Sequence, residues 1–208
     1  ERLGEEDAPE RTRELMADQS VNVIYEAAFR HEGILIFVDI LERNGTSWNA
    51  YEVKSSLRVS HVHFNDAALQ YYVLHESGIP VSGFSLVHIN GQYIREGAIQ
   101  LNRLFQIVNV TAHCEKQLTE IAGRIVEMKN VLAGQQIPEQ PIGEHCFQPY
   151  TCDFMGQCWK PRGEGSIFEL TGLSRTDAFQ LYQSGVEHIT GITDFSALNE
   201  MAKVQVAS

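Results

Sequence analysis

The sequence lacks the features that mark several classes of protein. No apolar run approaches the roughly 20 residues that a membrane-spanning helix needs, and the opening "ERLGEEDAPERTREL" has no signal-peptide character. We see no internal repeat and no low-complexity tract. The opening also lacks an initiator Met and reads as mid-protein, so we expect an upstream segment to be missing. We expect a cytoplasmic protein without a membrane partner.

Basic residues are scarce as well. Asp and Glu number 27 against 16 Lys and Arg, which gives a formal net charge of −11. An acidic balance of this size counts against broad electrostatic binding of nucleic acid. It does not exclude a nuclease, because catalytic carboxylates add to the same total. Any nucleic-acid surface on this chain therefore has to be local.

The order of apolar patterns predicts an α/β fold with a small mixed sheet. Short links and alternating side chains favour an antiparallel meander of three strands, over residues 21–29, 33–41 and 47–56. A helix over 63–78, capped by Asn65 or Asp66 and ended by Gly78, would cross over to a strand at 81–90. That strand would run parallel to a central one. Two further helices are expected, over 9–19 and 112–133.

Charged side chains interrupt strands that would otherwise be buried. Asp39 ends the apolar run "GILIFVD", and Glu52 and Lys54 lie two residues apart on the next strand, so their side chains share one face. Two converging carboxylates can hold a hard cation such as Mg²⁺ or Mn²⁺, with the carbonyl of Val53 as a further ligand. Such a cation polarises a phosphodiester and activates water. Lys54 would orient that water or neutralise charge on the phosphate.

The following helix adds to this pattern. Asp66 and Gln70 are four residues apart and share one helical face. Glu26 is a weaker candidate for an outer carboxylate, and a solvated strand residue is the favoured interpretation. His61 and His63 are candidates for phosphate contacts, and we expect at least one of them to face solvent. Glu-x-Lys alone is common on strands, so the competing interpretation is a set of ordinary surface pairs.

Three segments, "GILIFVDIL", "YEVKSS" and "DAALQYYVL", together resemble the PD-(D/E)XK nuclease superfamily. The resemblance is to its RecB-like branch, which includes CRISPR-associated exonucleases, and it covers roughly residues 20–160. It implies a restriction-endonuclease-like core within 1–133, a small mixed sheet flanked by helices. It also implies metal-dependent hydrolysis of DNA, single-stranded or with free ends, and most often from those ends.

By the same resemblance Asp39 and Glu52 would be metal ligands, Lys54 the catalytic lysine and Gln70 the helix residue facing the site. The branch often places a Tyr four residues after this Gln, where the chain has Leu74. Two tyrosines directly follow Gln70 instead, and core packing is the favoured role for one of them.

A cysteine-rich loop follows the core, within a linker and loop region over 134–161. It has the spacing C-x5-C-x5-C, which is not a standard zinc signature, at Cys146, Cys152 and Cys158. An iron–sulfur cluster, with zinc as the alternative, would use these thiolates. The resemblance implies such a cluster with a fourth, upstream cysteine. Cys114 is favoured as a buried small hydrophobe, although it or His145 remains an alternative fourth ligand.

The tail, 162–208, resembles a helix-hairpin-helix-like segment with turns at Gly172, Gly185 and Gly191. Related proteins often continue into an RNase H-like domain, so a further C-terminal domain is expected in a longer protein. Two interpretations compete with the nuclease. One is a non-catalytic nucleic-acid-binding or assembly module that retains the fold, and the other is a zinc-stabilised interaction domain.

Overall fold

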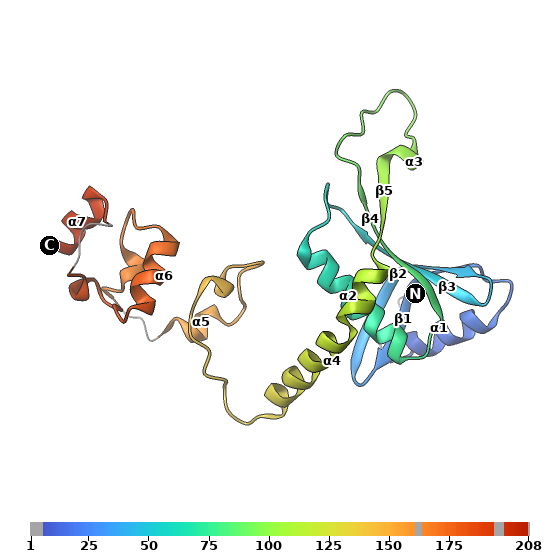
Figure 1. The fold of residues 1–208 in the computed structure, drawn as a ribbon, viewed down its shortest axis with the longest axis horizontal. Coiled ribbons are helices and arrows are strands. Elements are labelled where there is room, and N and C mark those ends of the chain that lie inside the picture. Colours follow the sequence, from blue (N-terminus) through green and yellow to red (C-terminus); the bar gives the residue numbers. More distant parts are fainter. Residues whose placement is uncertain (1–5, 161–163, 194–197, 208) are drawn as a thin grey trace. The chain divides into compact units, whose positions relative to one another are not determined.

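A mixed sheet of five strands, in the order β1-β2-β3-β4-β5, organises the first of two compact units (Figure 1). The computed structural model describes residues 6–160, 164–193 and 198–207. The first unit spans Glu1–Gly134 and the second Gln135–Ser208. Of the helices that the structure describes, none combines the length and the apolar character needed to cross a membrane.

The first three strands form the antiparallel meander that the sequence predicts. β1 (Val23–His31) pairs antiparallel with β2 (Ile34–Asn44), which pairs antiparallel with β3 (Ser47–Lys54). The two turns use glycines in the left-handed region, where Gly33 has a φ of 84° and Gly45 a φ of 62°. The Asn-Gly turn signal between the second and third strands is thus confirmed.

A helical crossover connects the meander to the rest of the sheet. α2 (His61–Glu76) leads to β4 (Val81–Ile89), which pairs parallel with β3 as the strand–helix–strand pattern predicts. α4 (Thr111–Ala133) packs against α2 and β4, and α1 (Ala8–Ala17) packs against β1. Helices therefore flank a mixed sheet, which confirms the α/β class.

The sequence patterns do not predict β5 (Phe105–Asn109) or the single helical turn before it, α3 (Leu101–Leu104). β5 pairs antiparallel with β4 at the edge of the sheet. Ile107 is 65% exposed and Phe105 38% exposed, so the strand carries no pattern of buried and exposed positions. Its pairing with β4 determines its conformation, and a sequence pattern cannot report that pairing.

The core of the first unit joins residues from the sheet, α2 and α4. Cys114 of α4 is completely buried in this core, and burial raises the pKa of its thiol to about 12. The thiol therefore stays protonated and packs as a small hydrophobe, as the favoured interpretation predicts. The largest fully buried side chains here are those of Phe84, Leu41, Leu74, Leu86, Val38 and Val73.

α2 begins at His61, two residues before the predicted start at 63. Its N-cap is Ser60, whose backbone N–H donates a hydrogen bond to Nδ1 of His63 at 3.3 Å. Neither Asn65 nor Asp66 caps the helix, so the capping prediction is wrong. The histidine closes the first turn in the place where a Glu or Gln is more usual. Because the helix starts early, Asp66 lies inside it and is free to face the sheet.

β1 departs from regular strand geometry at Glu26, whose φ is 51°. The flanking pairs, Tyr25 with Ile40 and Ala27 with Val38, place Glu26 opposite Asp39 of β2. The alternation of buried and exposed residues in β1 breaks at this point. Glu26 itself is exposed, which agrees with a solvated strand residue. The backbone strain thus lies directly beside one of the candidate metal ligands.

We expect Glu26→Gly to be more stable than Glu26→Ala by about 1 kcal/mol, because only glycine adopts a positive φ without a steric cost. Both variants remove the same carboxylate, so the alanine serves as the matched control. Urea unfolding followed by circular dichroism measures the difference. An alanine variant as stable as the glycine variant would show that Glu26 is not strained in solution.

The second unit contains short helices around two small apolar clusters. The elements are η1 (Glu144–Cys146), α5 (Met155–Cys158), η3 (Ile167–Glu169), α6 (Arg175–Gln183), η4 (Ile189–Gly191) and α7 (Glu200–Ala207). Gly172 and Gly185 have φ values of 85° and 91° and form turns, as predicted. Ser174 caps α6 by accepting a hydrogen bond from the N–H of Asp177. Short helices with glycine turns at two of the three predicted positions are thus confirmed, whereas Gly191 is the last residue of η4.

Candidate active site

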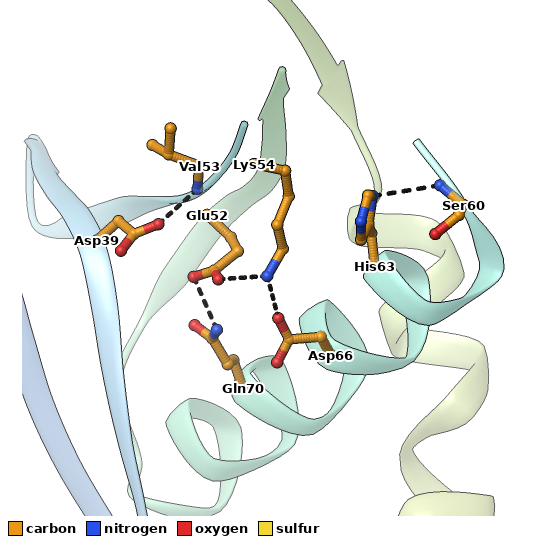
Figure 2. Close-up of polar contacts among 8 residues, drawn as sticks. All are labelled: Asp39, Glu52, Val53, Lys54, Ser60, His63, Asp66 and Gln70. Atoms are coloured by element: carbon orange, nitrogen blue, oxygen red, sulfur yellow. Dashed lines mark hydrogen bonds and ion pairs between the residues drawn. The ribbon is translucent and has the colours of Figure 1, made fainter. Parts of the chain in front are cut away.

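Asp39 lies where β2 and β3 separate. The pairing of the two strands ends at Ile40 and Tyr51, and the next position brings Asp39 opposite Glu52. Oδ2 of Asp39 accepts a hydrogen bond from the backbone N–H of Val53 at 2.6 Å (Figure 2). The carboxylate therefore takes the place of a main-chain acceptor at the fork. This contact uses the N–H of Val53 and does not involve its carbonyl. The carbonyl as a metal ligand stays a prediction.

Glu52 carries the buried carboxylate of the cluster and is only 8% exposed. Its Oε1 accepts a hydrogen bond from Nζ of Lys54 at 2.7 Å, and its Oε2 accepts one from Nε2 of Gln70 at 2.8 Å (Figure 2). Each carboxylate oxygen thus has a donor. This satisfies the requirement that a buried charge be paired and hydrogen-bonded.

α2 supplies two of the polar partners from one face. Asp66 forms an ion pair with Lys54, and Gln70, one turn later, reaches Glu52. The predicted shared face of Asp66 and Gln70 is therefore confirmed, and it faces β3. The ion pair between Asp66 and Lys54 was not predicted, because sequence spacing places Asp66 on the helix but does not specify which strand residue it meets.

The environment shifts the pKa values of Glu52 and Lys54. Burial raises the pKa of Glu52, and the charge of Asp39 adds to this, whereas the hydrogen bonds from Lys54 and Gln70 oppose it. Burial alone would lower the pKa of Lys54, but its bonds to Asp66 and Glu52 outweigh burial and raise it. Lys54 therefore remains a charged donor at neutral pH and does not serve as a base.

Asp39 and Glu52 offer a two-carboxylate site for a hard cation. Across the described ranges, no group of three or more His, Cys, Asp or Glu side chains is placed to hold a metal ion. Mg²⁺ commonly binds through one or two carboxylates, with waters and substrate phosphate as the other ligands. Oε1 of Gln70 is buried beside Glu52 without a hydrogen-bond partner among those same residues. A buried acceptor of this kind indicates space for a further donor, such as water.

Three histidines belong to the segments around this cluster, two at the start of α2 and one on β4. His63 hydrogen-bonds at the start of α2, and burial, followed by the charge of Lys54, lowers its pKa. His61 is exposed, as expected for one of the pair. His88 of β4 is the register partner of Lys54 and is 5% exposed. His88 was not predicted from the sequence, because its position beside Lys54 depends on the parallel register.

The cysteine loop belongs to the second unit. Cys146 is 4% exposed and packs with Ile142 and Phe179, and its carbonyl accepts a hydrogen bond from the N–H of Cys152 at 2.9 Å. The thiols of Cys146, Cys152 and Cys158 are free. They do not form a metal-binding group with any described neighbour. As folded here, the loop does not fit a cluster without movement of its side chains.

Comparison with known proteins adds no assignment. Neither a scan against protein-family models nor a search of curated proteins finds a match to this chain. Asp39, Glu52, Lys54 and Gln70, at the fork between β2 and β3, are the feature of the chain that bears most directly on function.

We expect the pKa of Glu52 to lie above that of an ordinary Glu side chain, and to rise further in Lys54→Met. The substitution removes both a hydrogen bond and a positive charge from the carboxylate. An NMR titration of ¹³C-labelled Glu side chains measures both values, with Lys129→Met, which unpairs the exposed Glu32, as control.

The sign of the linked stability change follows from this shift. Between the pKa of unfolded Glu and the higher pKa of folded Glu52, the folded protein holds more protons than the unfolded protein. The contribution of Glu52 to the free energy of unfolding therefore decreases as pH rises through that window. A folded pKa at or below the ordinary value would contradict the geometry of the site.

Proposed function

We propose that the first unit is a divalent-metal-dependent nuclease of the PD-(D/E)XK type, RecB-like branch, that hydrolyses DNA and acts from its ends. The observation that carries the proposal is the meeting of four polar side chains from β2, β3 and α2. Asp39 and Glu52 are opposite at the strand fork, and Lys54 and Gln70 both hydrogen-bond to Glu52. A sheet flanked by helices is compatible with a restriction-endonuclease-like core.

In this proposal Asp39 and Glu52 hold Mg²⁺ or Mn²⁺, aided by the carbonyl of Val53. The bound cation supplies Lewis-acid activation of the phosphodiester and of a water. Lys54 stays protonated through its bonds to Glu52 and Asp66, so it stabilises negative charge that develops on the phosphate. Gln70 fixes the orientation of Glu52 and presents Oε1 as an acceptor for the attacking water.

The competing proposal is a nucleic-acid-binding or assembly module without catalysis. It is favoured by the two acidic partners of Lys54, which are Glu52 and Asp66. Compensation of a buried charge is by itself a sufficient role for a lysine held between two carboxylates. Under this proposal the cluster stabilises the seam between β3 and α2. Divalent-metal binding is then unnecessary.

We expect Mn²⁺-dependent cleavage of end-labelled single- or double-stranded DNA, lost on addition of EDTA. Lys54→Ala should reduce kcat/KM at least about 100-fold, since it removes a charged donor from the reacting phosphate. Lys129→Ala, which removes an exposed lysine paired with Glu32 in the same unit, is the matched control. Circular dichroism verifies that both variants are folded.

Equal cleavage by wild type and Lys54→Ala would refute the assignment of the site. DNA binding without metal-dependent products in a folded wild-type protein would favour the non-catalytic module. The pattern of labelled products separates cleavage from ends from internal cleavage.

We also propose that the cysteine loop holds an iron–sulfur cluster, with zinc as the alternative, through Cys146, Cys152 and Cys158. What supports this is the concentration of three free thiols in one short loop, two of them on segments joined by a backbone hydrogen bond. Binding would require the thiols to turn toward one another. Metal sites frequently form only as the metal binds, and the role would be structural.

Protein purified without oxygen should contain iron and acid-labile sulfide, or zinc for the alternative site. Cys152→Ser should lose most of this metal, because a thiolate ligand is removed. Cys114→Ala, in the core of the first unit, should retain it. Metal analysis by mass spectrometry gives the answer, and equal metal content in Cys152→Ser and wild type would overturn the assignment.

A further inference from the structure

A pocket of about 470 Å³ opens beside the candidate active site. It is formed by the loop after β3, the end of β4 with the residues that follow it, and β5. Its walls combine apolar and polar side chains, including Leu57, Arg58, Val59, His88, Gln92 and Gln106. A volume of this size falls in the range of small-molecule sites. None of the residues assigned to catalysis lines it.

His88 is held in one orientation at the wall of this pocket. Its Nδ1 lies 2.9 Å from the carbonyl oxygen of Ile89. A carbonyl only accepts, so Nδ1 carries a proton, and in the tautomer that this bond selects Nε2 is an acceptor. The residue is only 5% exposed, and Nε2 has no hydrogen bond to any described residue. Nε2 is therefore available to accept a hydrogen bond from the N–H of a ligand.

The register of the sheet places the pocket next to the acid–lysine cluster. His88 and Lys54 are partners on neighbouring parallel strands, so their side chains project to the same side of the sheet. A group bound in the pocket would therefore adjoin a phosphate bound at Lys54.

The residues that line the pocket include one arginine, Arg58, and neither Asp nor Glu. Lys54 adjoins the pocket through its register partner His88, and it is paired there with Glu52 and Asp66. A guanidinium at the wall of the pocket favours a ligand that carries a phosphate. Leu57, at the pocket, is 60% exposed and offers an apolar surface to a ring.

We propose that this pocket binds the base of one unpaired nucleotide next to the phosphate held at Lys54. Leu57 and Val59 pack against the ring, and His88 Nε2 accepts a hydrogen bond from its exocyclic or ring N–H. Gln92 and Gln106 contact the rest of its edge, and Arg58 pairs with a flanking phosphate. As a substrate subsite the pocket rests on the proposed nuclease function. A base can occupy it only when it is unstacked, so an end that is single-stranded or frayed is the form that fits.

The test measures binding separately from cleavage. Fluorescent single-stranded oligonucleotides, intact or with one abasic residue placed at successive positions, are titrated with the full chain in Ca²⁺ and followed by anisotropy. One abasic position should weaken binding about 5- to 100-fold, the range of a single stacked base. In Gln106→Ala the ratio between the affinities for intact and abasic oligonucleotides, here called the dependence on the base, should be smaller than in the wild type. Arg58→Ala should weaken intact and abasic oligonucleotides alike, because it removes a phosphate contact.

Gln106 and Arg58 are exposed, so these substitutions leave the core intact. Arg124→Ala, which removes an exposed arginine from α4, is the matched control and should bind as wild type does. His88→Phe fills the pocket while removing Nε2, and should abolish the dependence on the base in a variant shown to be folded.

The outcomes separate the two proposals. Metal-dependent cleavage with binding that ignores the abasic residue at every position overturns the base pocket and leaves the nuclease. Base-dependent binding that Gln106→Ala diminishes, without cleavage by wild type, supports the pocket and overturns the nuclease. The pocket is also overturned if Gln106→Ala and His88→Phe both show the same difference in affinity between intact and abasic oligonucleotides as the wild type.

Discussion

Burial of the Glu52 carboxylate is the constraint on which the polar structure of the first unit depends. An unpaired carboxylate in a protein interior costs several kcal/mol, so its neighbours must donate to both oxygens. Lys54 does so from the same strand, and Gln70 does so from α2. Asp66 in turn pairs with Lys54. Compensation of one buried charge thus links α2 to β3 through Gln70 and Asp66, while apolar residues of α2 pack in the core.

Much of the first unit could be predicted from sequence because its patterns are local. Alternation and an Asn-Gly turn specify the meander, and Glu52 and Lys54 share a face by strand geometry alone. What was missed depends on contacts between distant segments. β5 is an edge strand with exposed apolar residues, and His88 comes beside Lys54 only through parallel register. The distortion at Glu26 has no sequence signal, since a Glu seldom adopts a positive φ.

The sequence predicts which residues form the site better than it predicts the hydrogen bonds between them. Asp39, Glu52, Lys54 and Gln70 are together, but the amide of Val53 as the donor to Asp39 depends on where two strands separate. The cysteine loop is the opposite case. Its spacing is plain in the sequence, while the structure holds Cys146 in an apolar cluster. Spacing along a chain establishes which thiols can meet, and the fold of the loop decides whether they do.

The polar residues of the site come together through two kinds of chain connection, a hairpin and a crossover helix. Asp39 meets Glu52 through a hairpin, a contact of short sequence separation and therefore of small loop-closure entropy. Lys54 and the Val53 amide belong to the same hairpin, so a paired meander already supplies one donor to each acid. Gln70 and Asp66 reach the cluster only when the crossover helix has docked. The second donor to the buried carboxylate, and the second acid beside Lys54, therefore depend on docking of α2.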